Sequence, residues 1–240
     1  MGLGIGNTSV IKCVKIGKSS KHPAFRCRIQ LVDESLIEEA AKFMDEYFIA
    51  NSNLENSYDS VDGDEMIDKN YSFWRVPLSE GISLAAFLED DEDDESRMIC
   101  CSVLGVAKKE EKTVVSKLEK PSKRVEHIIQ TQEDLIGKAD VFSLFNCDAY
   151  VTGHGMATAP KFQRRGIGEE MLRARSQICR LTNIPVSAAV FTGEASQKLA
   201  KKCGYETLAE LDLTTYHIDG RIVYPHPNWP VIKWMAIRYF

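Results

Sequence analysis

A glycine turn flanked by arginines is the segment of this 240-residue chain best suited to bind a ligand. Residues 162–168 read FQRRGIG and stand between a strand-like run and a helix-like run. Glycines at such a junction let the backbone curl until successive N–H groups point into one space. These amides and the positive end of the helix dipole attract anions, and Arg164 and Arg165 add positive charge. We therefore expect the turn to bind a pyrophosphate or a ribose phosphate.

Two widespread phosphate-binding motifs do not fit this turn. A P-loop requires Gly-Lys-Ser/Thr, whereas Gly166 is followed by Ile167, Gly168, Glu169 and Glu170, which excludes nucleotide hydrolysis of that kind. A dinucleotide fingerprint requires a third glycine where Met171 stands, and it would open a sheet instead of following several strands. A tight turn without a ligand is the remaining alternative.

The turn does fit the pattern Gln/Arg-x-x-Gly-x-Gly/Ala, and in this it resembles the GNAT acetyltransferases. The resemblance implies a mixed α/β fold with a central, mostly antiparallel twisted sheet of about seven strands flanked by helices. It also implies acetyl-coenzyme A as cosubstrate, whose pantetheine would pair with the backbone of Met156 and Thr158. The diphosphate would rest on the turn amides, which belong to Gln163, Arg164, Arg165, Gly166, Ile167 and Gly168.

The insect arylalkylamine N-acetyltransferases are the branch that residues 26–239 resemble, through their spacing and the YPHPNWP segment before the last strand. Those enzymes carry Phe-Phe-x-Asp-Glu-Pro-Leu after the first helix, and its glutamate is the catalytic base. Residues 48–54 read FIANSNL here, so Ser52 stands at the glutamate position and Asn53 at the proline position. Serine cannot act as a base near neutral pH. This departure leaves open the standard mechanism and the typical substrates: dopamine, tyramine, serotonin and octopamine.

His154 is our candidate for the missing base. An alkylamine has a pKa of about 10, as the lysine ammonium does, so acetyl transfer requires removal of a proton. His154 lies on the strand that would flank the thioester, with Gly153 and Gly155 leaving space around it. In the vertebrate arylalkylamine enzymes a His-x-His pair occupies this strand; His154 matches its second member and Thr152 replaces the first. A histidine that is merely packed is the alternative.

Two hydroxyl groups could assist the transfer, because Thr192 and Ser196 match serines that the insect enzymes use near the substrate and the sulfur. A helix N-cap without a chemical role is the alternative for Ser196. Cys203 shares an apolar helix face with Leu199 and Ala200, which predicts burial. We therefore expect direct, sequential transfer to a small amine. Two hypotheses compete with it: a catalytically impaired coenzyme-A-binding sensor or interaction protein, and an acetyltransferase of protein N-termini or lysines.

The remaining sequence must position these groups. Residues 1–25 lack a period and predict a flexible leader, whereas residues 26–240 predict a single domain. Apolar runs at 82–88 and 98–106 predict an antiparallel hairpin whose acidic connection, residues 89–95, is a solvated tip without calcium. Strands are also predicted at 26–32, 149–158, 186–191, 205–213 and 231–239, and helices at 35–48, 125–144, after residue 167 and at 196–203.

Composition limits the possible partners. The formal net charge of −5 provides no field for nucleic acid, and no stretch approaches the roughly 20 apolar residues of a membrane span. Seven cysteines without a CxxC pair favour reduced thiols and a cytoplasmic location. His127, His217 and His226 lack metal-ligand spacing, so we expect no metal. We expect a monomer or a weak homodimer.

Overall fold

An eight-stranded sheet organises the chain in the computed structural model, which describes residues 10–17, 23–59, 72–89, 97–110 and 122–240. All neighbouring strands are antiparallel except β5 and β6, which are parallel. The mixed, mostly antiparallel fold is therefore confirmed. The strand order is β1 (Val10–Ile16), β2 (Phe25–Leu31), β3 (Leu84–Leu88), β4 (Met98–Lys108), β5 (Ala149–Thr158), β6 (Val186–Phe191), β10 (Val231–Arg238) and β7 (Glu206–Asp212).

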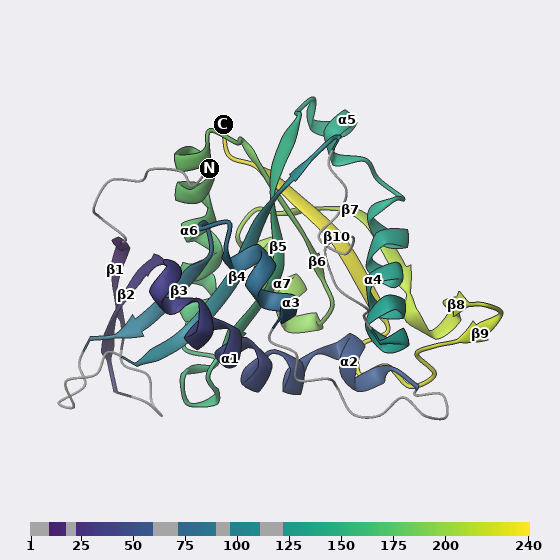
Figure 1. Ribbon diagram of the computed structural model, residues 1–240, viewed down its shortest axis with the longest axis horizontal. Helices are drawn as coiled ribbons and strands as arrows, with labels where there is room; N and C mark the ends of the chain where they lie inside the picture. Colours follow the sequence, from purple (N-terminus) through teal and green to yellow (C-terminus); the bar gives the residue numbers. More distant parts are fainter. Residues whose placement is uncertain (1–9, 18–22, 60–71, 90–96, 111–121) are drawn as a thin grey trace.

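Helices flank this sheet (Figure 1). They are α1 (Ile37–Tyr47), α2 (Asn53–Ser57), α3 (Ser72–Leu78), α4 (Lys123–Ile136), α5 (Val141–Phe145), α6 (Ile167–Thr182) and α7 (Glu194–Lys202). In the view of Figure 1, α1 and α3 lie in front of β3 and β4, and the two helices contact each other. A two-stranded ribbon of β8 (His217–Ile218) and β9 (Arg221–Ile222) projects beside α4. Within the described ranges, no helix is both long and apolar enough to cross a bilayer.

Helix α6 follows directly from its sequence. Ile167, Met171, Ala174 and Ile178 recur at helical spacing and are all buried. Glu169 and Glu170 occupy the first turn, where negative charge is favoured by the helix dipole. The helix ends at Asn183, whose φ of 55° is left-handed.

The N-terminal prediction is wrong for residues 10–16, which form β1 instead of a flexible leader. Four of the seven residues in the run VIKCVKI are β-branched, which favours a strand, and pairing along β2 satisfies one edge of its backbone. Lys12 also forms an ion pair with Glu170 of α6. The strand therefore depends on partners that are distant in sequence. The single domain of residues 26–240 stays a prediction.

Other predicted elements differ only in their limits. The predicted helix at 125–144 is divided into α4 and α5, because the first helix ends at Gly137 and Asp140 caps the second. The predicted hairpin is confirmed as β3 and β4, but most of its acidic connection lies outside the described residues.

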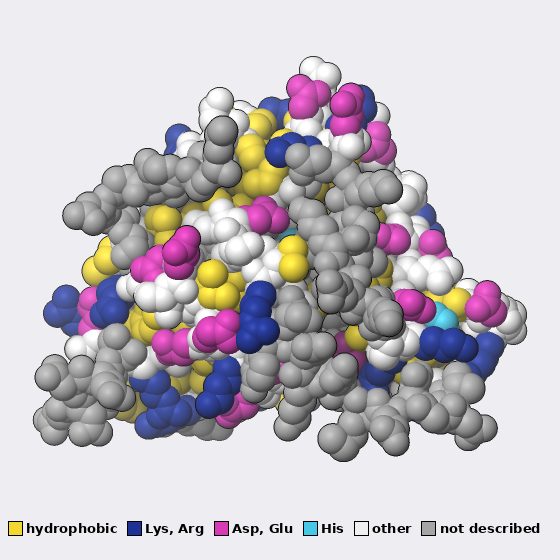
Figure 2. Space-filling view, viewed as in Figure 1, with side chains coloured by type: hydrophobic (Ala, Val, Ile, Leu, Met, Phe, Trp, Pro, Cys, Tyr) yellow, Lys and Arg dark blue, Asp and Glu magenta, His cyan; other side chains and the backbone are white. Residues whose placement is uncertain are grey.

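On the face shown in Figure 2, basic side chains lie among acidic ones.

Candidate active site

The parallel strands β5 and β6 pair only over a short stretch. Val151, Thr152 and Gly153 lie opposite Ser187, Ala188 and Ala189, and beyond Gly153 the strands part (Figure 1). The outer half of β5 continues to Thr158, still paired with β4 along its other edge. Along residues 154–158, the edge toward β6 has no paired strand within the described chain. An extended molecule could form hydrogen bonds to this edge as an added strand would.

The glycine turn stands at the end of this strand. Arg164 and Gly166 both have positive φ, 57° and 93°, which curls the backbone between β5 and α6. The amides of residues 164–168 donate to no described backbone group, whereas those of Glu169 and Glu170 donate to Gly166 O at 3.1 and 3.2 Å. Gln163 Nε2 donates to Thr158 O at 3.0 Å and ties the turn to the strand. The turn thus presents the amides of residues 164–168, whereas Gln163 N, also predicted to hold the diphosphate, donates to Pro160 O at 3.3 Å. The anion site stays a prediction.

The two arginines of the turn differ. Arg164 is exposed, but the Arg165 guanidinium lies 4.3 Å from the ring centroid of Phe25 and donates to Pro23 O. We expected the Arg165 side chain to add charge for a phosphate, and the structure instead packs it against an aromatic face. The backbone amide of Arg165 remains in the turn. Its side-chain packing fixes the turn to the start of β2.

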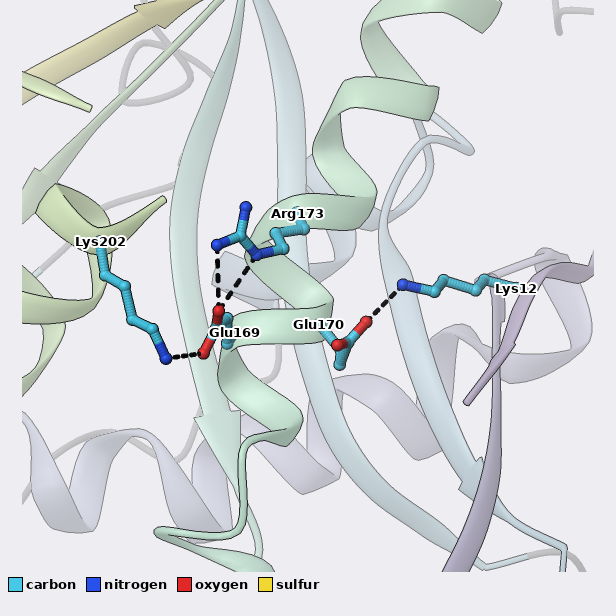
Figure 3. Close-up of polar contacts among 5 residues, drawn as sticks. All are labelled: Lys12, Glu169, Glu170, Arg173 and Lys202. Carbon is cyan, nitrogen blue, oxygen red and sulfur yellow. Dashed lines mark hydrogen bonds and ion pairs between the residues drawn. The ribbon is translucent and has the colours of Figure 1, made fainter. Parts of the chain in front are cut away.

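The acidic first turn of α6 could repel a phosphate, but both carboxylates are paired. Glu169 accepts hydrogen bonds from Lys202 and, second, from Arg173, and these bonds lower its pKa. Glu170 pairs with Lys12 of β1 on the other side of the helix (Figure 3). These cations offset the negative charge beside the amide turn.

His154 is the extra residue of a β-bulge between β4 and β5. Gly153 lies opposite Leu104 and Gly155 opposite Val103, so His154 has no opposite residue. Its Nε2 is buried without a hydrogen-bond partner among the described residues. Burial, and then the charge of Arg175, lower the pKa of His154 to about 4. The imidazole is therefore neutral at pH 7, so one of its two ring nitrogens can accept a proton.

The bulge places its neighbours against opposite helices. A Cβ on Gly153 would stand 2.7 Å from Nη1 of Arg175 in α6, whereas one on Gly155 would stand 3.0 Å from the Phe48 ring after α1. Phe48 packs edge-on against Trp74, which is itself core. Phe48 therefore lies beside the bulge, on the side of the sheet that α1 covers.

The predicted hydroxyl groups are mainly committed to helix starts. Ser196 Oγ donates to Gly193 O at 2.8 Å and accepts from Gly193 N at 3.3 Å, at the beginning of α7. Ser52 caps α2 by accepting from Glu55 N at 3.4 Å. Asn53 Nδ2 donates to Thr192 O at 2.9 Å, so α2 and the end of β6 lie together. The structure thus joins the segments of Ser52 and Thr192.

Sequence reasoning missed two charged residues beside the bulge. Arg175 is 3% exposed, and its Nη2 donates to Ser102 Oγ at 3.2 Å. Its position was visible in the sequence, because it follows Met171 by four residues on the apolar face of α6. Glu80 follows α3, and its Oε2 accepts from Val106 N at 2.8 Å. No periodicity indicates Glu80, because it lies in a turn.

The cysteines are placed as structural thiols. Burial raises the pKa of Cys100 to about 12 and also raises that of Cys101, which explains why neither is a ready nucleophile. Cys13 alone among the seven is exposed. No group of three His, Cys, Asp or Glu side chains in the described ranges could hold a metal ion.

We expect one cysteine to react rapidly with Ellman's reagent in the native protein at pH 8, because only Cys13 is exposed. Cys13→Ser should remove the fast phase, and Cys203→Ser should leave it intact. Stopped-flow absorbance of the released chromophore measures both. A fast phase that survives Cys13→Ser would contradict this assignment.

Known proteins share this architecture. One crystal structure is described as that of arylalkylamine N-acetyltransferase 7 from the yellow fever mosquito Aedes aegypti. Its TM-score is 0.84 and its sequence identity 25%, over 97% of this chain and 95% of the mosquito chain. Arylalkylamine N-acetyltransferase 2 of the same mosquito has a TM-score of 0.77 and 14% identity over 89% and 99%. The Drosophila melanogaster polyamine N-acetyltransferase has a TM-score of 0.74 and 16% identity over 88% and 99%.

The sequence itself gives the family. A search of curated proteins found no match. Residues 84–205, which span β3 to the residue before β7 and include the parted strands and the amide turn, match the acetyltransferase (GNAT) family. This chain therefore belongs to the GNAT acetyltransferase family.

Proposed function

We propose that the protein transfers an acetyl group from acetyl-coenzyme A to a small primary amine. The observation that carries this proposal is the row of amides at residues 164–168, which lies at the end of the unpaired edge of β5. Family membership supports the reaction class. The structural neighbours are named as arylalkylamine acetyltransferases and as an enzyme that forms N-acetylagmatine, and these names support a small amine as acceptor.

The chain offers a fitting set of groups for the cosubstrate. The backbone edge at Met156 and Thr158 would hold the pantetheine, and the amides of the turn would hold the diphosphate. Thr158 O already accepts from Gln163, so its amide is the group still available at that residue. When bound, acetyl-coenzyme A supplies the acetyl group as an activated thioester.

Side chains of this chain would accept and donate the protons of the reaction. His154 is neutral at pH 7 and would accept the proton that leaves the amine nitrogen. Thr192 is the better hydroxyl for protonating the leaving thiolate, because Ser196 already donates to Gly193 O. Ser52 caps α2 and would contribute shape instead of a proton. A cytoplasmic location and a monomer or weak homodimer stay predictions.

Thiol release tests this function. The protein is incubated with acetyl-coenzyme A and a panel of arylalkylamines, polyamines and peptides, and we expect release only with small amines. His154→Ala should lower kcat by about 100-fold, the scale of lost acid–base catalysis. His226→Ala, which removes an exposed imidazole, is the matched control.

Calorimetry with coenzyme A separates the alternatives. Binding without thiol release for any amine would favour the sensor hypothesis, and release with peptides alone would favour a protein acetyltransferase. Full activity of His154→Ala would reject His154 as the base. An absence of coenzyme A binding would reject the proposal altogether.

A further inference from the structure

Glu80 reaches the bulge from the side of the sheet where β3 begins. It lies in the turn after α3, where Glu80 N donates to Pro77 O at 3.2 Å. Its Oε2 accepts from Val106 N on the edge of β4, at 2.8 Å. Strand β3 pairs with β4 only as far as Leu84 opposite Ser102, so the edge of β4 beyond this point needs other partners. Glu80 supplies one of them with a single carboxylate oxygen.

The other carboxylate oxygen of Glu80, Oε1, lies close to the same backbone position as His154 Nε2, namely Gly105. A Cβ on Gly105 would stand 2.8 Å from His154 Nε2 and 3.1 Å from Glu80 Oε1. The two side chains, one from β5 and one from the turn after α3, therefore both lie against Gly105, without a hydrogen bond between Nε2 and the carboxylate in this structure. The φ of Gly105 lies outside the left-handed region, so its conformation does not require glycine. Glycine is needed there because a Cβ would collide with the side chains of His154 and Glu80.

The ring nitrogen of His154 that lies nearest to Gly105 is Nε2. His154 Nε2 is buried, and it has no hydrogen-bond partner among the described residues, although such atoms are normally satisfied. Arg175, the other charged group at His154, is a cation and cannot accept a proton from Nε2. The carboxylate of Glu80 can accept it.

We propose that Glu80 is a positioning residue for His154, which orients the imidazole by holding its proton on Nε2 and leaves Nδ1 free to accept the proton of the amine. This inference rests on the proposed function, because it assigns a partner to the proposed base. The N–H bond of the ammonium breaks as an N–H bond to Nδ1 forms. The Glu80 carboxylate then balances the imidazolium charge, which Arg175 opposes.

Strand capping alone does not account for this arrangement. Ser83 caps the same edge at Leu104, where its Oγ accepts from Leu104 N at 3.0 Å and donates to Leu104 O at 3.2 Å. A neutral side chain therefore suffices to cap this edge. Only a carboxylate can also accept from a histidine and balance its charge.

Nitrogen-15 NMR of the ligand-free protein tests the inference. At pH 7 the wild type should show the His154 tautomer with the proton on Nε2. Glu80→Gln retains an oxygen for Val106 N but removes the charge, so it should shift the population toward the Nδ1-protonated tautomer. Glu38→Gln is the matched control, since Glu38 pairs with Arg75 at an exposed position on α1 and should leave the spectrum unchanged.

Kinetics provides the second readout. Glu80→Gln should lower kcat about 10-fold, a fraction of the range for acid–base catalysis, with the KM for acetyl-coenzyme A unchanged. A wild-type tautomer with the proton on Nδ1, or identical spectra for wild type and Glu80→Gln, would overturn the inference. If the wild type acetylates no amine, the proposed function fails, while the NMR result still decides whether Glu80 orients His154.

Discussion

Gly153→Ala should lower the free energy of unfolding by about 3 kcal/mol, at the upper end of the cost of overpacking a core. The added Cβ would stand 2.7 Å from Nη1 and 3.0 Å from Cζ of Arg175. The guanidinium is buried and donates to Ser102 Oγ, so it cannot move without losing that bond. Loss of that bond would leave Nη2 without a partner as well, because Nε and Nη1 already have none among the described residues.

Urea denaturation followed by tryptophan fluorescence measures this cost, and the Tm should fall by roughly 6–12 °C. Gly17→Ala is the matched control, because no atom lies within 4 Å of its added Cβ. In an Arg175→Ala background, Gly153→Ala should cost less than about 1 kcal/mol, since the clash is gone. Equal costs in the two backgrounds would show that Arg175 is not the obstacle.

The glycine turn could be predicted because its information is local. The amides of residues 164–168 and the start of α6 depend on neighbouring residues, and the apolar periodicity of α6 is likewise visible in a short window. The side-chain contacts of Arg165 could not be predicted from such local information. Its side chain is drawn to Phe25, 140 positions earlier in the chain, which no local pattern indicates.

Long-range contacts account for the other errors. Strand β1 contains lysines and follows a glycine-rich segment, and it is held by β2 and by Glu170 of α6. Glu80 comes to His154 only because β4 and β5 bring Gly105 beside the bulge. Ser52 was placed by resemblance alone, and the structure shows that its hydroxyl caps α2. Sequence thus predicted the backbone conformation of the turn better than it predicted the contacts of these side chains.

Protonation of His154 should destabilise the folded protein as the pH falls. The pKa of His154 is lowered to about 4, against an ordinary value of about 6.5, first by burial and second by Arg175. Between these values the unfolded chain binds the proton more readily than the folded protein does. The stabilisation is therefore complete above about pH 6.5 and is lost progressively as the pH approaches 4.

The expected loss is about 2 kcal/mol between pH 7 and pH 5, from this one group. His154→Gln cannot titrate, so its free energy of unfolding, measured by urea denaturation at each pH, should fall less steeply than that of the wild type. His226→Gln, at an exposed position, should follow the wild type and thus control for the loss of an imidazole. Parallel curves for the wild type and His154→Gln would mean that His154 is protonated as easily in the folded protein as in the unfolded chain. The bulge would then be open to water, and the neutral imidazole on which the proposed proton transfer depends would be lost in mild acid.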